Sequence, residues 1–192
     1  PKVFYIMAAG KDVLKKAVGW AYSPKPVIPE NGWYCPTRDV FQARLETMLP
    51  DLEQKLKNEA FLLGAIVGEI GNNSFDHNLG RWQDTPGIFF AFDKEKKMIV
   101  LADRGVGILA TIKNVLPKVK DDSEALRLAF TKIISGRKGE HRGNGLKFVA
   151  NVLKERKWRL EFSSGIARAL LPNLLIENTQ KYLGGCLAVI KY

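Results

Sequence analysis

The stretch IFFAFDKEKKMIVLADRGVGI, residues 88–108, carries two apolar runs separated by the polar link DKEKK. Short apolar runs rich in β-branched and aromatic residues are typical of strands, and a short polar link between two of them favours a hairpin. We therefore expect strands at Ile88–Phe92 and Met98–Ala102, after which the chain becomes rich in glycine.

Two helices are expected before this hairpin. Thr37 is a suitable N-cap, Asp39 adds an acid to the first turn, and Pro50 is expected to end the first helix. From about Asp51 to His77 the apolar residues recur every three or four positions, as they do in an amphipathic helix.

The segment after the hairpin predicts three further helices and two strands. The helices are expected near Ile108–Val115, Ser123–Ile134 and Gly145–Lys154, with a basic loop over Ser135–Arg142 and strands at Trp158–Ser163 and Cys186–Lys191. This order predicts an α+β two-layer sandwich, in which a mixed, mainly antiparallel sheet carries its helices on one face.

Residues 1–39 are rich in proline and are interpreted as an N-terminal extension of a domain over residues 40–192. Val3–Ala8 is expected to form a strand and Asp12–Ala21 a short helix, whereas the stretch SPKPVIPENGWYCP is expected to be irregular. The extension either caps the sheet or joins two copies in a homodimer, and both interpretations stay open.

The composition is ordinary for a globular domain, with 46% hydrophobic and 26% charged residues. No stretch approaches the roughly 18 apolar residues of a membrane-spanning helix, and the first residues lack the basic region of a signal peptide. Cys35 and Cys186 lie far apart and outside any metal-binding motif. We therefore expect reduced thiols, a cytoplasmic location and no membrane partner.

The chain is basic, because 30 Lys and Arg residues against 20 Asp and Glu give a net charge of +10. Such a charge attracts nucleotides, nucleic acid or acidic protein partners, although a solvated basic surface is an equally good explanation. Aromatic residues do not alternate with the basic ones as on a base-stacking surface, so the sequence supports nucleic-acid binding only weakly.

Three motifs carry candidate chemistry, and the first is EIGNNSFDHN, residues 69–78. Glu69 and Asn73 are four positions apart and share one face of the expected helix, while Asp76 and His77 fall on its next turn. An amide oxygen is a suitable ligand for Mg²⁺, and a carboxylate can position a water molecule. A solvated polar helix end is the alternative interpretation.

The second motif, DRGVGI, begins with Asp103 directly after the expected strand. A carboxylate fixed there can accept a hydrogen bond from the adenine amino group, whereas guanine would present a carbonyl to the same acceptor. Gly105 and Gly107 allow a sharp turn and a close approach of the backbone to a ligand. The alternative is an ordinary turn from a strand into a helix.

The third motif is RGNGLKFV, in which Gly143 and Gly145 open a helix. Free N–H groups at the start of a helix suit a phosphate group. Nearby cations add positive charge, namely Arg137, Lys138, Arg142 and Lys147. A glycine-started helix without a ligand is the alternative.

Other nucleotide-binding motifs fit less well. A Walker A sequence is absent. The segment from Gly105 to Ala110 matches the dinucleotide fingerprint GxGxxA, but the following strand with an acidic end that a Rossmann unit needs is missing.

In this order the three motifs resemble the N, G1 and G2 boxes of the GHKL or Bergerat-fold ATPases, which include DNA gyrase, heat-shock chaperones, histidine kinases and MutL. The resemblance covers about Val40 to Tyr192, and the glycines that define the G1 and G2 boxes match. The segment GGCLAVIKY resembles the last strand of histidine-kinase domains, although Gly-Gly-Cys replaces the usual Gly-Thr. The resemblance implies the Bergerat fold and a histidine-kinase-like ATP-binding domain over residues 40–192.

The resemblance also implies roles for single residues. Asn73 would ligate Mg²⁺, Glu69 would activate a water molecule, and Asp103 would bind the adenine amino group. Gly105 and Gly107 would start a mobile ATP lid over residues 109–142. The other residues expected to bind the nucleotide are Asp76, His77, Ile108, Arg137, Lys138, Arg142, Gly143, Gly145 and Leu146.

The implied function is an Mg-ATP-binding domain that hydrolyses ATP or transfers its γ-phosphate to a partner protein, as ATPases and histidine or anti-sigma kinases do. No histidine precedes the first motif, so phosphorylation of the chain's own preceding helices is not expected. The alternative is a non-enzymatic module in which ATP regulates binding to nucleic acid or to an acidic protein.

Overall fold

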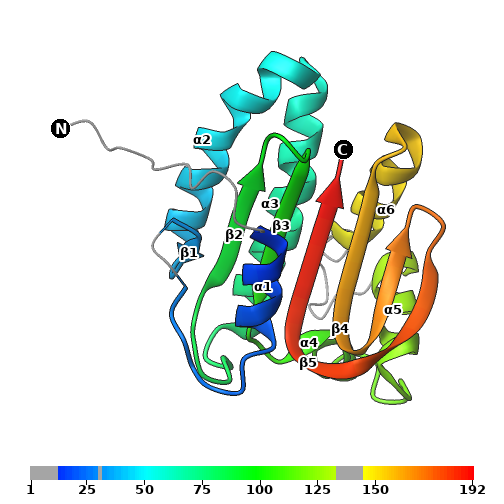
Figure 1. Ribbon diagram of the computed structural model, residues 1–192. Coiled ribbons are helices and arrows are strands. Elements are labelled where there is room, and N and C mark those ends of the chain that lie inside the picture. Colours follow the sequence, from blue (N-terminus) through cyan, green and yellow to red (C-terminus); the bar gives the residue numbers. More distant parts are fainter. Residues whose placement is uncertain (1–12, 30–31, 133–144) are drawn as a thin grey trace.

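The computed structural model describes residues 13–29, 32–132 and 145–192, and these residues form six helices and five strands (Figure 1). In chain order the elements are α1 (Val13–Ala21), β1 (Tyr34–Cys35), α2 (Arg38–Leu56), α3 (Glu59–Asn78), β2 (Ile88–Asp93), β3 (Met98–Asp103), α4 (Gly107–Lys113), α5 (Asp122–Thr131), α6 (Gly145–Arg156), β4 (Arg159–Leu171) and β5 (Leu175–Lys191). The fold is α+β, as predicted, whereas the strand expected at Val3–Ala8 lies outside the described residues. Within these ranges no helix is both long and apolar enough to cross a bilayer.

The strands form one sheet in the order β1-β2-β3-β5-β4, and each described pairing is antiparallel, so the prediction of a mixed sheet is wrong for the described strands. The predicted hairpin of β2 and β3 is therefore confirmed. β3 is paired on both sides, so its last residue, Asp103, lies between Ile88 of β2 and Cys186 of β5. This position fixes the second motif at one end of the sheet.

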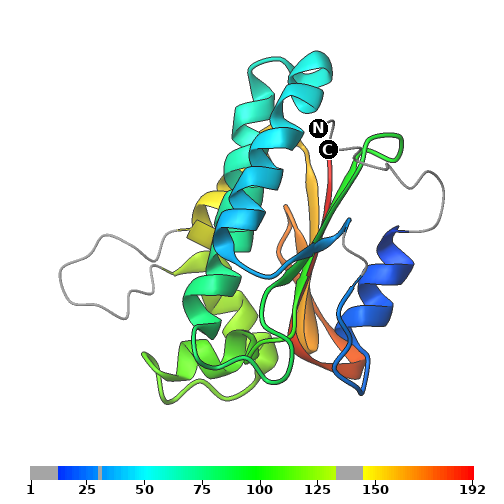
Figure 2. The same ribbon diagram turned by 90° about the vertical axis from the view of Figure 1, so that its left-hand side faces the viewer.

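Both faces of the sheet are covered, as the edge-on view in Figure 2 shows. One face packs against α2, α3, α5 and α6 over a core that includes Leu63, Ile99 and Leu160. On the other face Ala17 and Trp20 of α1 belong to a second core. The prediction of helices on one face thus holds for residues 40–192 but is wrong for α1, because its apolar side covers the second face of the sheet.

The boundaries of α2 agree with the sequence at the start and differ at the end. Thr37 caps the helix, as predicted, because its side chain accepts a hydrogen bond from the Val40 N–H at 3.4 Å. Pro50, however, lies inside α2 and does not end it. Pro50 is exposed, so water can satisfy the carbonyl that its missing N–H leaves free. The break comes at Lys57, whose φ of 51° is left-handed, and α3 follows from Glu59.

The hairpin of β4 and β5 is much longer than predicted. It bends at irregular pairings between Ser164 and Ala167, and its outer half lies against α5 (Figure 1). Asp122, at the start of α5, accepts a hydrogen bond from the Ile166 N–H at 3.0 Å. Gly165 has a φ of 61°, and a Cβ added there would lie 2.0 Å from Cγ of Asp122. The bend therefore requires glycine for both its conformation and its space.

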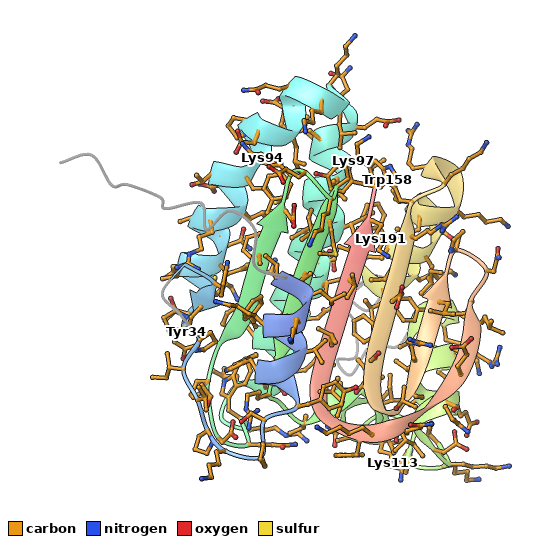
Figure 3. All side chains as sticks on the ribbon, viewed as in Figure 1. Tyr34, Lys94, Lys97, Lys113, Trp158 and Lys191 are labelled. Carbon is orange, nitrogen blue, oxygen red and sulfur yellow. The ribbon has the colours of Figure 1, made fainter. Side chains whose placement is uncertain are left out.

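The two ends of the sheet carry different groups. Figure 3 shows Lys94, Lys97, Lys191 and Trp158 near one end, where β2 turns into β3. Lys113 lies near the opposite end, where β3 finishes. The glycine-rich second motif therefore lies at the end of the sheet away from the β2–β3 turn.

Gly71→Ala and Gly68→Ala form a matched pair of variants within α3. A Cβ at Gly71 would lie 2.2 Å from the ring of Phe41, which is fully buried and packs edge-on against Phe90. At Gly68 the nearest atom, Cδ2 of Leu45, would lie at an ordinary 3.5 Å. In urea denaturation we expect Gly71→Ala to lower the free energy of unfolding by about 1–3 kcal/mol. Gly68→Ala should leave it unchanged or raise it by up to about 1 kcal/mol, because alanine favours a helix. Equal effects of the two substitutions would contradict this packing.

Candidate functional site

A cleft of about 1230 Å³ lies between α3, the end of β3, α4 and the start of α6. Its volume exceeds the roughly 300–1,000 Å³ of typical small-molecule pockets. The predicted site residues that line it are Glu69, Asn73, Asp76, His77, Asp103, Gly107, Ile108, Gly145 and Leu146. The three motifs, which are distant in sequence, thus meet at one cleft.

Asp103 is buried in the wall of the cleft, with 1% of its surface exposed. Its carboxylate accepts hydrogen bonds from Oγ of Ser74 at 2.8 Å, from the Gly105 N–H at 2.9 Å, and from Cys186 across the strand pair. Burial nevertheless raises the pKa of Asp103, because loss of water outweighs these bonds to the charged form. The carboxylate is therefore held in one orientation by donors from three parts of the chain.

Asn78 of α3 fixes the backbone that follows this carboxylate. It is 4% exposed, and its Oδ1 accepts a hydrogen bond from the Val106 N–H at 2.8 Å. Its Nδ2 donates to the carbonyl of Ser74 at 2.8 Å and to Oδ1 of Asp103 at 3.4 Å. A Cβ added at Gly105 would lie 2.0 Å from Oδ1 of Asn78. Only glycine permits the second motif to approach the helix of the first so closely.

The start of α4 rests on the hairpin of β4 and β5. Gly107 has a φ of 75°, and a Cβ there would lie 2.9 Å from both the Gly184 carbonyl oxygen and Oγ of Ser164. Oγ of Ser164 accepts from the Ile108 N–H at 3.0 Å and donates to the carbonyl of Gly185 at 3.0 Å. These contacts hold the second motif against the last strand of the sheet.

The first and third motifs meet at the start of α6. A Cβ added at Gly145 would lie 2.1 Å from Oε2 of Glu69 and 3.7 Å from Nδ2 of Asn73. Glu69 is exposed and Asn73 is partly buried, and both line the cleft. A carboxylate and an amide therefore lie side by side at the first residue of a 12-residue helix.

Asp76 and His77 line the same cleft but have different surroundings. Asp76 is exposed and forms an ion pair with Arg38 of α2, which was not among the predicted site residues. His77 is exposed on the last turn of α3. Their part in nucleotide binding stays a prediction. Ile108 and Leu146 are partly buried and contribute apolar walls.

Part of the predicted site lies outside the described residues, namely Arg137, Lys138, Arg142 and Gly143. Most of the earlier part of the predicted lid forms α4 and α5. Leu126 and Phe130 of α5 are buried, and the Phe130 ring packs edge-on against Phe162 of β4 at 5.5 Å. This part of the predicted lid is therefore packed into the core.

Four further polar residues, which contact Asp103 or the start of α4, were not predicted as site residues, namely Ser74, Asn78, Ser164 and Cys186. Ser74 and Asn78 had a sequence signal, because they are polar and four positions apart on a helix whose earlier turns are apolar. Ser164 had none, since the bend of its strand was not predicted. Cys186 was interpreted only as a reduced thiol, and both cysteines are indeed free. Burial and the neighbouring Asp103 raise the pKa of Cys186, so it stays a neutral thiol at pH 7.

Asn73 and Glu69 are the candidate groups for holding a divalent cation. Across residues 13–29, 32–132 and 145–192, no three His, Cys, Asp or Glu side chains are grouped to bind a metal by themselves. Mg²⁺ usually keeps several waters and takes one or two protein ligands in addition to phosphate oxygens. An amide and a carboxylate fit this donor set, and the missing Cβ of Gly145 allows the Glu69 carboxylate to lie close to the start of α6.

Comparison with known proteins assigns no family to the chain. No protein-family model matches it, and no curated protein or solved structure is significantly similar to it. The interpretation of the site therefore depends on the geometry of its own residues.

Gly107→Ala and Gly80→Ala separate backbone strain from close packing. Both glycines have positive φ, 75° and 68°, but nothing lies within 4 Å of a Cβ at Gly80. Gly80→Ala should lower the free energy of unfolding by about 1–2 kcal/mol through its left-handed conformation alone. Gly107→Ala should lower the free energy of unfolding by about 1–3 kcal/mol more than Gly80→Ala, because its Cβ would contact the Gly184 carbonyl. Chemical denaturation measures both, and equal losses would be inconsistent with this contact.

Proposed function

We propose that the chain is an Mg-ATP-binding domain with the Bergerat fold, which hydrolyses ATP or transfers its γ-phosphate to a partner protein. The observation that carries the proposal is the meeting of three distant motifs at one cleft, with Asp103 buried in its wall and Glu69 beside Gly145. Motifs that matched the family by chance would have no reason to meet in space. The antiparallel sheet, covered by helices of residues 40–192 on one face, supports the same assignment.

Asp103 is the residue best suited to recognise the base. Its carboxyl group lines the cleft, and its oxygens are held in place by donors from α3 and β5. The amino group of adenine would donate to it. A base with a carbonyl at the same position would face an acceptor in a buried environment, which costs free energy. The domain should therefore prefer adenine to guanine or hypoxanthine.

Glu69, Asn73 and the start of α6 are suited to the phosphate end of the ligand. Asn73 would hold Mg²⁺, which when bound neutralises charge on the phosphates. The N–H groups at the start of α6 would face phosphate oxygens. Glu69 would orient a water molecule towards the γ-phosphate, and phosphoryl transfer needs such positioning more than covalent help. Transfer to a partner protein would use the same groups with a side chain in place of the water.

The dinucleotide-binding alternative is incompatible with the sheet. A Rossmann unit needs parallel strands joined by a crossover helix, whereas β3 is antiparallel to both of its neighbours. The nucleic-acid-binding alternative rests on the net charge of +10 alone. ATP binding followed by hydrolysis or transfer is therefore the better-supported proposal.

Asp103→Asn should weaken Mg-ATP binding by about 10- to 100-fold, because one hydrogen bond to a charged group is worth about 1.5–3 kcal/mol. It should also reduce the preference for ATP over inosine triphosphate, which carries a carbonyl in place of the amino group. Isothermal titration calorimetry measures both quantities. Asp93→Asn is the matched control, since Asp93 ends β2 at the other end of the sheet. A wild-type chain that binds neither nucleotide would refute the proposal.

Glu69→Gln should reduce phosphate release from ATP by about 10²- to 10⁴-fold, the usual contribution of a positioned base, with little change in ATP affinity. A phosphate-release assay compared with a binding titration separates the two effects. Glu46→Gln, on the exposed side of α2, is the control and should change neither. If the wild type releases no more phosphate than Glu69→Gln, the proposal of ATP hydrolysis is wrong. Transfer of labelled γ-phosphate to partner proteins is then the activity to assay.

A further inference from the structure

Arg104, the residue after the base-reading aspartate, is 8% exposed and makes five hydrogen bonds, as many as a guanidinium has N–H groups. Two of them go to the carboxylate of Asp84, one from Nε at 2.8 Å and one from a terminal nitrogen. The other three go to the backbone carbonyls of Trp20 at 2.6 Å, Ser23 at 2.9 Å and Lys25 at 3.4 Å. Arg104 is therefore fully engaged inside the protein.

The three carbonyls belong to the end of α1 and to the residues that follow it. Carbonyls at the end of a helix lack partners within the helix and carry partial negative charge. α1 has no basic residue in its last turn. Arg104 supplies the missing cation, and its guanidinium also lies 5.9 Å from the centre of the Trp20 ring. The contact holds α1 against the loop that carries the second motif.

On its other side, Arg104 is tied to the loop between α3 and β2. The hydrogen bond from Arg104 is the main reason why the pKa of Asp84 is lowered, so this carboxylate stays charged at neutral pH. The Gln83 N–H donates to the carbonyl of Arg104 at 3.3 Å. A Cβ at Gly184 would lie 2.7 Å from Oε1 of Gln83, and the carbonyl of Gly184 is the group against which Gly107 packs. Arg104 thus lies between α1 and the groups that shape the cleft.

We propose that Arg104 is a positioning residue that couples the docking of α1 to nucleotide binding, and the inference rests on the proposed function. Movement of α1 would move the guanidinium, and with it the backbone from Asp103 to Gly105, whose N–H orients the base-reading carboxylate. α1 itself lies on the face of the sheet opposite the other helices (Figure 2). By linkage, ATP binding stabilises the docked helix by the same factor by which docking strengthens ATP binding. α1 is then a regulatory element for the cleft.

Arg104→Lys keeps the charge but loses the planar fork that reaches Asp84 and the carbonyls at the same time. We expect the dissociation constant for Mg-ATP to rise about tenfold, within the usual range of coupling between sites. The ratio of the constants for inosine triphosphate and ATP should fall towards one, because Asp103 no longer reads the base. A general loss of folded protein would raise both constants equally and leave the ratio unchanged. Calorimetric titrations measure the ratio, with Arg156→Lys, in an exposed ion pair with Glu59, as the control.

Ala17→Asp tests the coupling from the far side of the sheet. Ala17 belongs to the side of α1 that packs on the sheet and is fully buried, so a carboxylate there should undock the helix without touching the cleft. We expect the dissociation constant for Mg-ATP to rise, and the ratio of the constants for inosine triphosphate and ATP to fall, as much as in Arg104→Lys. Saturating ATP should also slow hydrogen exchange of the α1 amides in the wild type, and should slow it less in Arg104→Lys.

The outcomes distinguish failure of the coupling from failure of the proposed function. The coupling is supported if both variants raise the dissociation constant for ATP and lower the ratio, and if ATP slows hydrogen exchange of the α1 amides in the wild type. A wild type that binds ATP, with unchanged affinity and ratio in both variants, overturns the coupling and leaves the proposed function in place. A wild type that does not bind ATP refutes the proposed function, and the coupling with it. If either variant does not fold, Asp84→Asn, which removes only one partner of Arg104, provides the same measurement.

Discussion

One buried carboxyl group organises this structure. The carboxylate of Asp103 is withdrawn from water at the end of a central strand, and a buried carboxylate without donors would cost several kcal/mol. Its donors come from α3, from the loop after β3 and from β5, so three separate parts of the chain must be in place before this carboxyl group has its hydrogen-bond partners. The same parts form the walls of the cleft. The stability of this end of the sheet and the shape of the site are thus two results of one constraint.

How much of the fold could be predicted depended on the range of each interaction. The cap at Thr37 and the hairpin of β2 and β3 arise between neighbours in sequence, and both were predicted. Pro50 was misjudged because the residues on either side of it, such as Met48 and Leu52, are buried against the core and hold the helix together. The bend at Gly165 depends on a carboxylate of α5, and no local pattern reveals such a partner.

The site shows the same division between local and distant causes. The spacing of the glycines in the second motif was visible in the sequence, but the group that each glycine faces was not. Gly105 packs against α3 and Gly107 packs against the hairpin of β4 and β5, and both elements are distant in sequence. The helical spacing of Ser74 and Asn78 is visible in the sequence, but the partners of the Asn78 amide are not. No sequence signal indicated the contact of Cys186 with the Asp103 carboxylate, because cross-strand register is a property of the whole sheet. Nothing in the sequence around Arg104 indicates its partners, and only the folded chain shows the five acceptor atoms around its guanidinium.

The order of the strands also bears on how the protein is made. β5 lies between β3 and β4, yet it is the last of the described strands along the chain. On the ribosome, the helices and the first hairpin emerge while β3 still has an unpaired edge, and contacts between such distant segments form late. Cys186 and Ala188 of β5 belong to the cleft wall, so a nascent chain has no complete pocket until this strand leaves the exit tunnel. Prematurely terminated chains would lack the middle of the sheet and would present its edges to chaperones and proteases.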